Sequence, residues 1–156
     1  MALIEAFWDS YLVDSNILLR IPRWNEPENA FVDDAIAALR KSGAVLYFTH
    51  QNIAEFWNVA TRPLNVNGFG LTHDETEREV RSIERAMVFL PDGPRVYAVW
   101  RNLVATRSVS GKQVHDARLV AAMMVHGVTR LLTLNTADFK RYPEITAVHP
   151  RAVGVL

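Results

Sequence analysis

The chain has 156 residues, of which 49% are hydrophobic and 22% are charged, and 17 basic residues balance 17 acidic ones. This length favours a single domain, residues 1–156, with a core large enough to fold without crosslinks. The absence of cysteine excludes disulfides, thiolate metal sites and cysteine nucleophiles, and the zero net charge is atypical of nucleic-acid-binding proteins, which are usually basic.

The sequence contains no feature that predicts a membrane protein or an exported one. No stretch reaches the roughly 18 consecutive apolar residues of a membrane-spanning helix. The N-terminal segment MALIEAFWDS contains Glu5 and Asp9 and lacks a basic start, so we expect no secretory signal peptide. The expected location is therefore the cytoplasm, with no membrane partner.

The N-terminal third of the chain contains two apolar runs and one helical pattern. The short run at residues 11–13 predicts a buried strand. Pro27 opens a helical pattern that continues to Lys41, and Gly43 follows as a typical residue just beyond a helix end. The run at residues 45–48 then predicts a second buried strand.

The middle of the chain predicts two helices separated by a loop. The first helix starts at Thr49 or Gln51 and ends before Pro63, because the residue before a proline disfavours helical geometry. Residues 64–71 are rich in asparagine and glycine, which predicts a loop. Thr72 then opens a capping box, a hydroxyl residue followed three positions later by glutamate, so the second helix begins there.

The C-terminal part of the chain continues the alternation of strands and helices. Residues 88–90 predict a third strand, and Pro94 opens another helix. Residues 115–126 are apolar nearly all round, as expected of a helix that is buried on most sides. Residues 131–134 predict a fourth strand, and a fifth is expected within residues 145–149.

Short apolar strands separated by helices predict an α/β fold with a central, mainly parallel five-stranded sheet flanked by helices. Open sheets of this kind bind ligands beyond the carboxyl ends of their strands, where the strand order reverses. Asp14 follows the first predicted strand, and Asn135 and Asp138 follow the fourth. If these two strands are neighbours, the polar side chains meet at one edge of the sheet.

Four acidic residues stand at informative positions, and each has a purely structural explanation as well. Asp14 and Asp138 follow strands, where a carboxylate can bond to nearby backbone N–H groups of a turn. Asp116 opens a predicted helix, where it can cap the helix or complement its dipole. Glu55 shares a helical face with Gln51, opposite the apolar stripe, as a solvated glutamate would. Position alone leaves a structural and a functional role open for each residue.

The segments that carry these acids follow one another in a recognisable order. Val13-Asp14-Ser15-Asn16 places an aspartate after a strand and before a hydroxyl residue and an asparagine. Glu55 lies early in a helix, Asp116 opens a buried helix, and residues 133–139 have the pattern Thr-x-Asn-x-x-Asp-Phe. Over residues 10–150 this order resembles the PIN-domain family, in particular the VapC-like ribonuclease toxins, in which threonine is commoner than serine after the first aspartate.

The resemblance implies a metal-dependent endoribonuclease, a hydrolase that cleaves RNA as the toxin of a type II toxin–antitoxin pair. It also implies a cognate antitoxin protein as partner, and a homodimer. Asp14 and Asp116 would be the primary ligands of Mg²⁺ or Mn²⁺, hard cations that bind carboxylate oxygens. Asp138 would complete the pocket, and Glu55 would bind a second ion or orient the attacking water.

The resemblance also implies supporting roles for polar neighbours of the acids. Ser15, Asn16 and Asn135 would hold the carboxylates in position. Arg62, one helical face along from Glu55, would contact the RNA backbone or a bound inhibitor. Clustered carboxylates repel one another strongly without a cation, so bound cations explain why a protein would keep them together.

Two other functions remain open from the sequence. A PIN-type fold can serve as a non-catalytic RNA- or protein-binding module, which intact acids at all four positions disfavour. An α/β phosphotransfer domain would use Asp14 as its nucleophile, but Asn16 stands where such phosphatases have a second aspartate. Other sites are not indicated, since the five histidines lack a zinc-binding spacing and no P-loop or nucleophile-elbow motif is present.

Overall fold

The computed structural model describes residues 9–23 and 26–154 of the chain. Residues 1–8, which make up most of the segment on which the expectation of no signal peptide rests, lie outside this part. No helix within it is long and apolar enough to cross a membrane. The strands are β1 (Ser10–Val13), β2 (Val45–Thr49), β3 (Val88–Leu90), β4 (Arg130–Leu132) and β5 (Thr146–Val148). The helices are α1 (Ser15–Leu18), α2 (Ala30–Lys41), α3 (His50–Thr61), α4 (His73–Ala86), α5 (Pro94–Thr106) and α6 (Gln113–His126).

The strands form one five-stranded sheet in the order β3-β2-β1-β4-β5, and every neighbouring pair is parallel. β1 lies at the centre, where Leu12 pairs with Tyr47 of β2 and with Leu131 of β4. Parallel strands need crossover connections, which explains why strands and helices alternate along the chain. The predicted α/β fold with a mainly parallel five-stranded sheet is therefore confirmed, and the sheet is parallel throughout.

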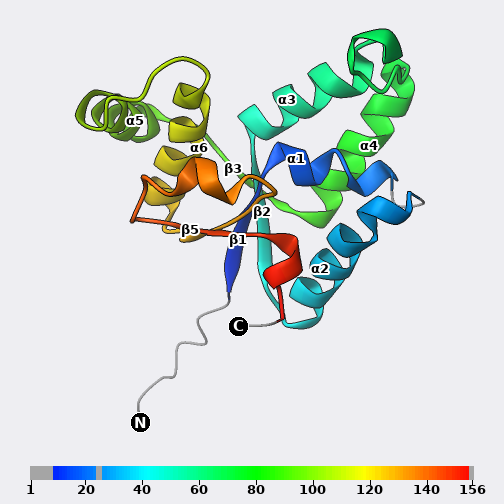
Figure 1. The fold of residues 1–156 in the computed structure, drawn as a ribbon, viewed down its shortest axis with the longest axis horizontal. Coiled ribbons are helices and arrows are strands. Elements are labelled where there is room, and N and C mark those ends of the chain that lie inside the picture. Colours follow the sequence, from blue (N-terminus) through cyan, green and yellow to red (C-terminus); the bar gives the residue numbers. More distant parts are fainter. Residues whose placement is uncertain (1–8, 24–25, 155–156) are drawn as a thin grey trace.

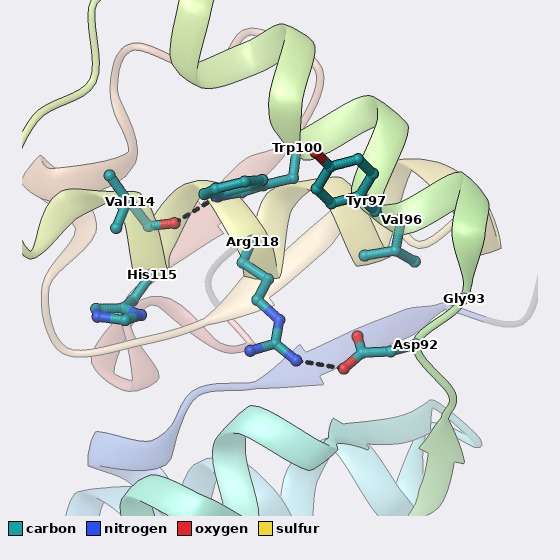
Figure 2. Close-up of a pocket in the computed structure, with 8 residues that line it drawn as sticks. All are labelled: Asp92, Gly93, Val96, Tyr97, Trp100, Val114, His115 and Arg118. Carbon is teal, nitrogen blue, oxygen red and sulfur yellow. Dashed lines mark hydrogen bonds and ion pairs between the residues drawn. The ribbon is translucent and has the colours of Figure 1, made fainter.

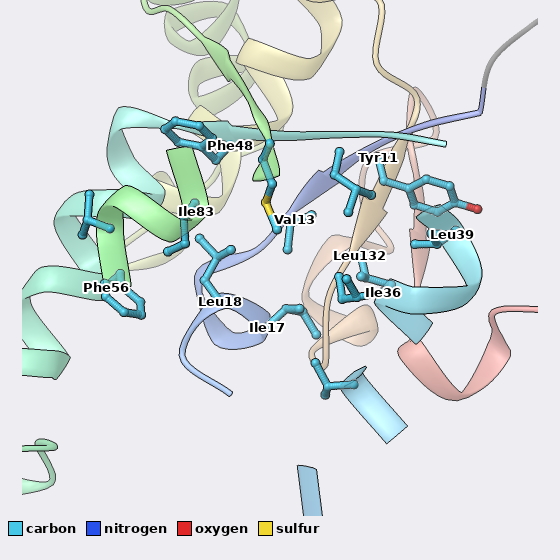
Figure 3. Packing of buried hydrophobic residues seen from close by; sticks show 14 of the residues in the cluster. Tyr11, Val13, Ile17, Leu18, Ile36, Leu39, Phe48, Phe56, Ile83 and Leu132 are labelled. Atoms are coloured by element: carbon cyan, nitrogen blue, oxygen red, sulfur yellow. The ribbon is translucent and has the colours of Figure 1, made fainter. Parts of the chain in front are cut away.

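The two faces of the sheet carry separate parts of the hydrophobic core. Tyr11 and Val13 of β1 pack against α1 to α4, in a cluster that includes Phe56 (Figure 3). Leu12 points to the opposite face, because successive residues of a strand alternate, and it packs with Val120 of α6. Helices α1 to α4 thus cover one face of the sheet, and α5 and α6 cover the other (Figure 1).

The predicted starts of the two middle helices are confirmed by their caps. The hydroxyl of Thr49 accepts a hydrogen bond from the backbone of Asn52, whose side chain accepts one from the backbone of Thr49. Thr72 and Glu75 make the same reciprocal pair at the start of α4. Gly43 follows α2 with a φ of 84°, the left-handed geometry expected just beyond a helix end.

The structure differs from the sequence-based expectations at several boundaries. β4 ends at Leu132 rather than Leu134, because the N–H of Leu134 bonds to the side chain of Asn16 instead of a neighbouring strand. The helix predicted from Pro27 begins with a 3₁₀ turn and becomes α-helical at Ala30. The sequence does not reveal α1, whose four residues are too few to show a helical period.

The strand order reverses between β1 and β4. After β1 the chain forms β2 and β3 on one side, and it then crosses to form β4 and β5 on the other. Open α/β sheets bind ligands in the crevice at the carboxyl ends of the strands that flank such a point. Val13 pairs with Leu132 in register, so the residues that follow both strands emerge at the same edge.

Candidate functional site

Asp14 follows β1 directly and is the most deeply placed carboxylate of this edge, with 7% of its surface exposed. Its Oδ1 accepts a hydrogen bond of 2.7 Å from the backbone N–H of Ser15, and it thereby caps α1. Its Oδ2 accepts a hydrogen bond of 2.8 Å from the hydroxyl of Thr133, a fully buried residue just past β4. The structural role as a cap is therefore real, and it also fixes the direction of the carboxylate.

Glu55 reaches the same edge from α3 and is half-buried rather than solvated. The hydroxyl of Ser15 donates to Glu55 Oε2 and lies 3.3 Å from Asp14 Oδ1. Gln51, one turn earlier on α3, donates from Nε2 to Glu55 Oε1 and to the carbonyl of His115, each over 2.9 Å. This face of α3 lies opposite the apolar stripe, as periodicity predicts, but it meets α1 and α6 instead of solvent.

Asp116 and Asp138 belong to two other segments near this edge of the sheet. Asp116 is half-buried in the first turn of α6, which starts at Gln113 with Lys112 as its N-cap residue. Capping is therefore excluded as the role of Asp116, while a favourable interaction with the helix dipole remains. Asp138 is exposed in a 3₁₀ turn, Thr136–Phe139, that follows β4.

The four carboxylates lie near enough to one another for their charges to affect the pKa values of Asp116 and Asp14. Burial, followed by the negative charges of the other three acids, raises the pKa of Asp116 from 3.8 to about 6. Burial also raises the pKa of Asp14, and the charge of Glu55 adds to this, while hydrogen bonds from Thr133 and Ser15 oppose it. Among the described residues, none of the four forms an ion pair with an arginine or a lysine. The site therefore concentrates negative charge that no ion pair within the described chain balances.

The four carboxylates are ligands of the kind that a hard divalent cation prefers, but their side chains are not close enough together to hold one directly. Mg²⁺ and Mn²⁺ bind carboxylate oxygens and keep several waters, and a cation would relieve the repulsion that adds to burial in raising the pKa of Asp116. Within residues 9–23 and 26–154, however, no three Asp, Glu or His side chains are close enough to hold one ion. An ion at this edge would be held partly through water, or after rotation of the side chains.

Asn16 and Thr133 form a polar network beside Asp14. The amide of Asn16 donates to Asp14 Oδ2 over 3.4 Å and to the hydroxyl of Thr133 over 3.3 Å, and its oxygen accepts from the N–H of Leu134. Asn16 thus joins the end of β1 to the end of β4. Asn135, also predicted to support the acids, contributes its backbone N–H to Thr133, and its own side chain is exposed.

Thr133 and Gln51 belong to the site, although the sequence-based assignment does not include them. Thr133 is the first fixed position of the Thr-x-Asn-x-x-Asp-Phe segment, so the motif itself holds the signal that identifies it. Gln51 shares a helical face with Glu55, but its burial depends on α6, which lies far away in the sequence. No local pattern reveals that contact.

Arg62 is hydrogen-bonded to the loop that follows α3. The resemblance implies a contact of this residue with RNA or an inhibitor. Its Nη2 donates to the carbonyl of Asn67 over 2.8 Å, and its buried Nε has no hydrogen-bond partner among the described residues. The carbonyl of Arg62 accepts from the N–H of Gly70, and a Cβ added at Gly68 would lie 1.8 Å from that oxygen. Arg62 therefore organises this loop, and its contact with a ligand stays a prediction.

Comparisons with known proteins agree with this architecture. The family model described as PIN domain matches residues 11–145 of the chain. Comparison with curated protein sequences gives no significant match.

Three solved structures with similar folds come from bacterial toxin–antitoxin systems. A chain of VapBC2 from Rickettsia felis, bound to a promoter DNA fragment, has 12% identity and a TM-score of 0.66, with 90% of this chain and 98% of that chain covered. A chain of a toxin–antitoxin complex from Klebsiella pneumoniae has 18% identity and a TM-score of 0.61, with 90% of this chain and 97% of that chain covered. A chain of VapBC-1 from nontypeable Haemophilus influenzae has 17% identity and a TM-score of 0.61, with 90% of this chain and 98% of that chain covered. At such identities the similarity concerns the fold.

Proposed function

The chain belongs to the PIN-domain family, and on this premise we propose that it is a Mg²⁺- or Mn²⁺-dependent endoribonuclease. It hydrolyses phosphodiester bonds of RNA and acts as the toxin of a type II toxin–antitoxin pair. The observation that carries the proposal is the convergence of four carboxylates, from β1, α3, α6 and the turn after β4, at the edge where the strand order reverses. VapC-like proteins of this family are typically nucleases, which is why we assign nuclease activity to this edge.

The residues of the chain have distinct parts in this proposal. A bound cation would supply Lewis acidity and an activated water at the site. Asp14 is the anchor for it, because the hydrogen bonds from Ser15 and Thr133 hold its carboxylate in one direction. Glu55 is oriented from both sides, by the hydroxyl of Ser15 and the amide of Gln51. Hydrogen bonds that orient metal ligands in this way usually matter nearly as much as the ligands themselves.

Asp116 and Asp138 complete the proposed site, from α6 and from the turn after β4. The pKa of Asp116 is raised first by burial and then by the negative charges of the other three acids, and a cation placed among the acids would relieve that repulsion. Asp138 is exposed, so it can turn toward an ion or a water without leaving a buried environment. These two residues are the ones whose rotation would close the ligand shell.

The test of the nuclease is cleavage of end-labelled RNA by the full chain with Mn²⁺ and with EDTA. We expect Asp14→Asn and Asp116→Asn each to lower the rate by more than about a hundredfold, because the loss of a ligand exceeds the loss of a supporting residue. Asp33→Asn is the matched control, since the pKa of Asp33 is also raised by burial but its charge does not act on Asp116. Undiminished cleavage by both site variants would contradict the assignment.

A second candidate function is a non-catalytic module that binds RNA or protein. One observation favours it, namely that no three potential ligands within the described residues are close enough to hold an ion. This candidate predicts that the wild-type chain binds RNA and leaves it intact with Mn²⁺ as with EDTA. The same assay therefore separates the two functions.

The proposed partners are an antitoxin protein and a second copy of the chain, and the proposed location is the cytoplasm. The similar structure from Klebsiella pneumoniae is a toxin–antitoxin complex, which supports an antitoxin as partner. If a short reading frame lies directly upstream, its product should bind the chain and relieve the growth inhibition that the chain causes alone. Growth inhibition that persists during co-expression would contradict the antitoxin part of the proposal.

A further inference from the structure

A cavity of about 350 Å³ lies between the start of α5 and the start of α6 (Figure 2). Its volume falls in the range of ligand sites in proteins, about 300–1,000 Å³. We call it the aromatic pocket. The residues of its wall that matter below are Asp92, Tyr97, Trp100, Val114, His115 and Arg118.

Two aromatic rings of α5 form one side of the aromatic pocket. The indole N–H of Trp100 donates to the carbonyl of Val114 over 2.8 Å, which fixes the plane of the ring. The ring of Tyr97 lies 6.2 Å from that of Trp100, and Tyr97 is 64% exposed. Exposed aromatic rings of this kind are stacking platforms for the bases of single-stranded nucleic acids.

The aromatic pocket adjoins the acidic site through two residues that it shares with a second cavity. His115 and Arg118 also line this neighbouring cavity of about 350 Å³, whose wall includes Glu55 and Gln51. Gln51 is 7% exposed, and its side-chain oxygen is buried without a hydrogen-bond partner among the described residues. An unpartnered buried acceptor is costly, so a donor from a ligand or a water that reached it would be bound favourably.

Arg118 stands between the carboxylates and the aromatic rings. Its guanidinium pairs with Asp92, and both side chains are partly exposed, at 42% and 32%. Exposed ion pairs of this kind are weak, so a phosphate can replace the Asp92 carboxylate at the guanidinium, whose planar fork suits phosphate. The chain therefore presents, in succession, a carboxylate site, an arginine and two aromatic rings.

From this succession we infer that the aromatic pocket binds the base of the nucleotide next to the cleaved phosphate, while Arg118 contacts an adjacent phosphate. The inference rests on the proposed function and adds to it a base-binding subsite on α5. A second copy of the chain would also cover Tyr97, but it would not call for an arginine and an unpartnered acceptor on the side toward the acids. Those two groups match a nucleotide.

The test measures binding of labelled single-stranded oligoribonucleotides, each made of one base, by fluorescence anisotropy with Mg²⁺. The parent is the full chain with Asp116→Asn, in which we expect cleavage to be too slow to consume the oligoribonucleotide. Tyr97→Ala should weaken the binding of at least one oligoribonucleotide about tenfold, and Tyr97→Phe, which keeps the ring, should stay within about twofold. Leu64→Ala is the control, because Leu64 is 77% exposed and lies outside both cavities; its binding should be unchanged.

Three results would overturn the inference. The first is Tyr97→Ala binding every oligoribonucleotide as the parent does, and the second is a parent that binds none. The third is a loss of binding accompanied by a change in molar mass in light scattering, which would assign the aromatic pocket to an interface between copies.

The proposed function is judged separately, from cleavage by the chain that keeps Asp116. Binding that depends on Tyr97, without Mn²⁺-dependent cleavage, refutes the nuclease and leaves the base-binding pocket standing. Cleavage that depends on Asp116, with binding indifferent to Tyr97, refutes the pocket and leaves the nuclease standing.

Discussion

At the level of single residues, Asp116 opposes the stability of the fold to which it belongs. Its pKa is raised from 3.8 to about 6, first by burial and then by the neighbouring carboxylates. A group whose pKa is raised on folding stabilises the fold below its unfolded pKa and loses that contribution as the pH rises through the folded value. Above about pH 6, the charged Asp116 therefore lowers the free energy of unfolding of the metal-free protein.

We expect Asp116→Asn to raise the free energy of unfolding in EDTA at neutral pH by about 1–2 kcal/mol, because the amide carries no charge. This gain in free energy is smaller than the whole rise in the pKa of Asp116 would imply, because its carboxyl group is half-exposed and screened by solvent. The gain should shrink toward about pH 4, where the wild-type carboxyl group is protonated in the fold. Urea denaturation across this pH range measures it, and a variant that is less stable throughout would point to the helix dipole instead.

Thr133 offers a second test, because its hydroxyl donates to a buried carboxylate. Thr133→Val removes the donor to Asp14 Oδ2 and should lower the free energy of unfolding by about 2 kcal/mol, as for other hydrogen bonds to charged groups. Thr76→Val is the control, since Thr76 is equally buried but donates only to the backbone carbonyl of Thr72. Its cost should be about 1 kcal/mol or less. Equal losses would mean that the charge of Asp14 is not what Thr133 stabilises.

The sequence locates some site residues and not the contacts that hold them. Asp14 can be placed, because an apolar run that ends at a strand terminus brings the next side chain to the sheet edge. Glu55 can be assigned only to a helical face, since its surroundings depend on Gln51 reaching the carbonyl of His115, 64 residues away. Helix-to-helix packing over such distances leaves no local pattern, so the site residues stay predictions until they are mutated.

At the level of elements, the two capping boxes permit a matched comparison. Thr49 and Asn52 are almost fully buried at the start of α3, whereas Thr72 is exposed at the start of α4. Thr72→Ala should cost about 1 kcal/mol of stability, as caps usually do, and Thr49→Ala about 2 kcal/mol. The larger loss follows because the buried backbone N–H of Asn52 would lose its acceptor, the hydroxyl of Thr49. Chemical denaturation of both variants measures the difference, and a smaller loss for Thr49→Ala would contradict it.

Helices and strands were predictable wherever a local signal decided them. The capping residues and the glycine at position 43 act within a few neighbours, so the starts of α3 and α4 and the end of α2 are confirmed. The end of β4 is different, because Asn16, from the other end of the chain, takes the N–H that would have continued the strand. The prediction was wrong at the position where a distant side chain competes with the sheet.

At the level of the whole molecule, the fold class follows from alternation but the strand order does not. Several orders satisfy five parallel strands with helical crossovers, and the sequence leaves open whether the first and fourth strands are neighbours. The observed order places β1 between β2 and β4. Because β1 and β4 are parallel neighbours, the motifs that follow these two strands lie at the same edge of the sheet.

A bound cation would connect both layers of helices, since Glu55 belongs to α3 on one face of the sheet and Asp116 to α6 on the other. We expect Mn²⁺ to raise the melting temperature, with about 2.7 kcal/mol of added stability at a hundred times the dissociation constant. Asp116→Asn should lose most of this shift, and Asp33→Asn should keep it. Scanning fluorimetry measures the shift, and a wild type indifferent to Mn²⁺ would contradict metal binding.

The order of the strands also has a consequence for biosynthesis. β1 receives its second neighbour only when Arg130, the register partner of Tyr11, has been made. A ribosome that has translated through α5 has produced Asp14 and Glu55 but neither Asp116 nor Asp138. The nascent protein therefore lacks the complete acidic edge until most of the chain exists. If the chain is the nuclease proposed above, its site would be complete only late in synthesis, and an inhibitor made alongside it could meet the site as it forms.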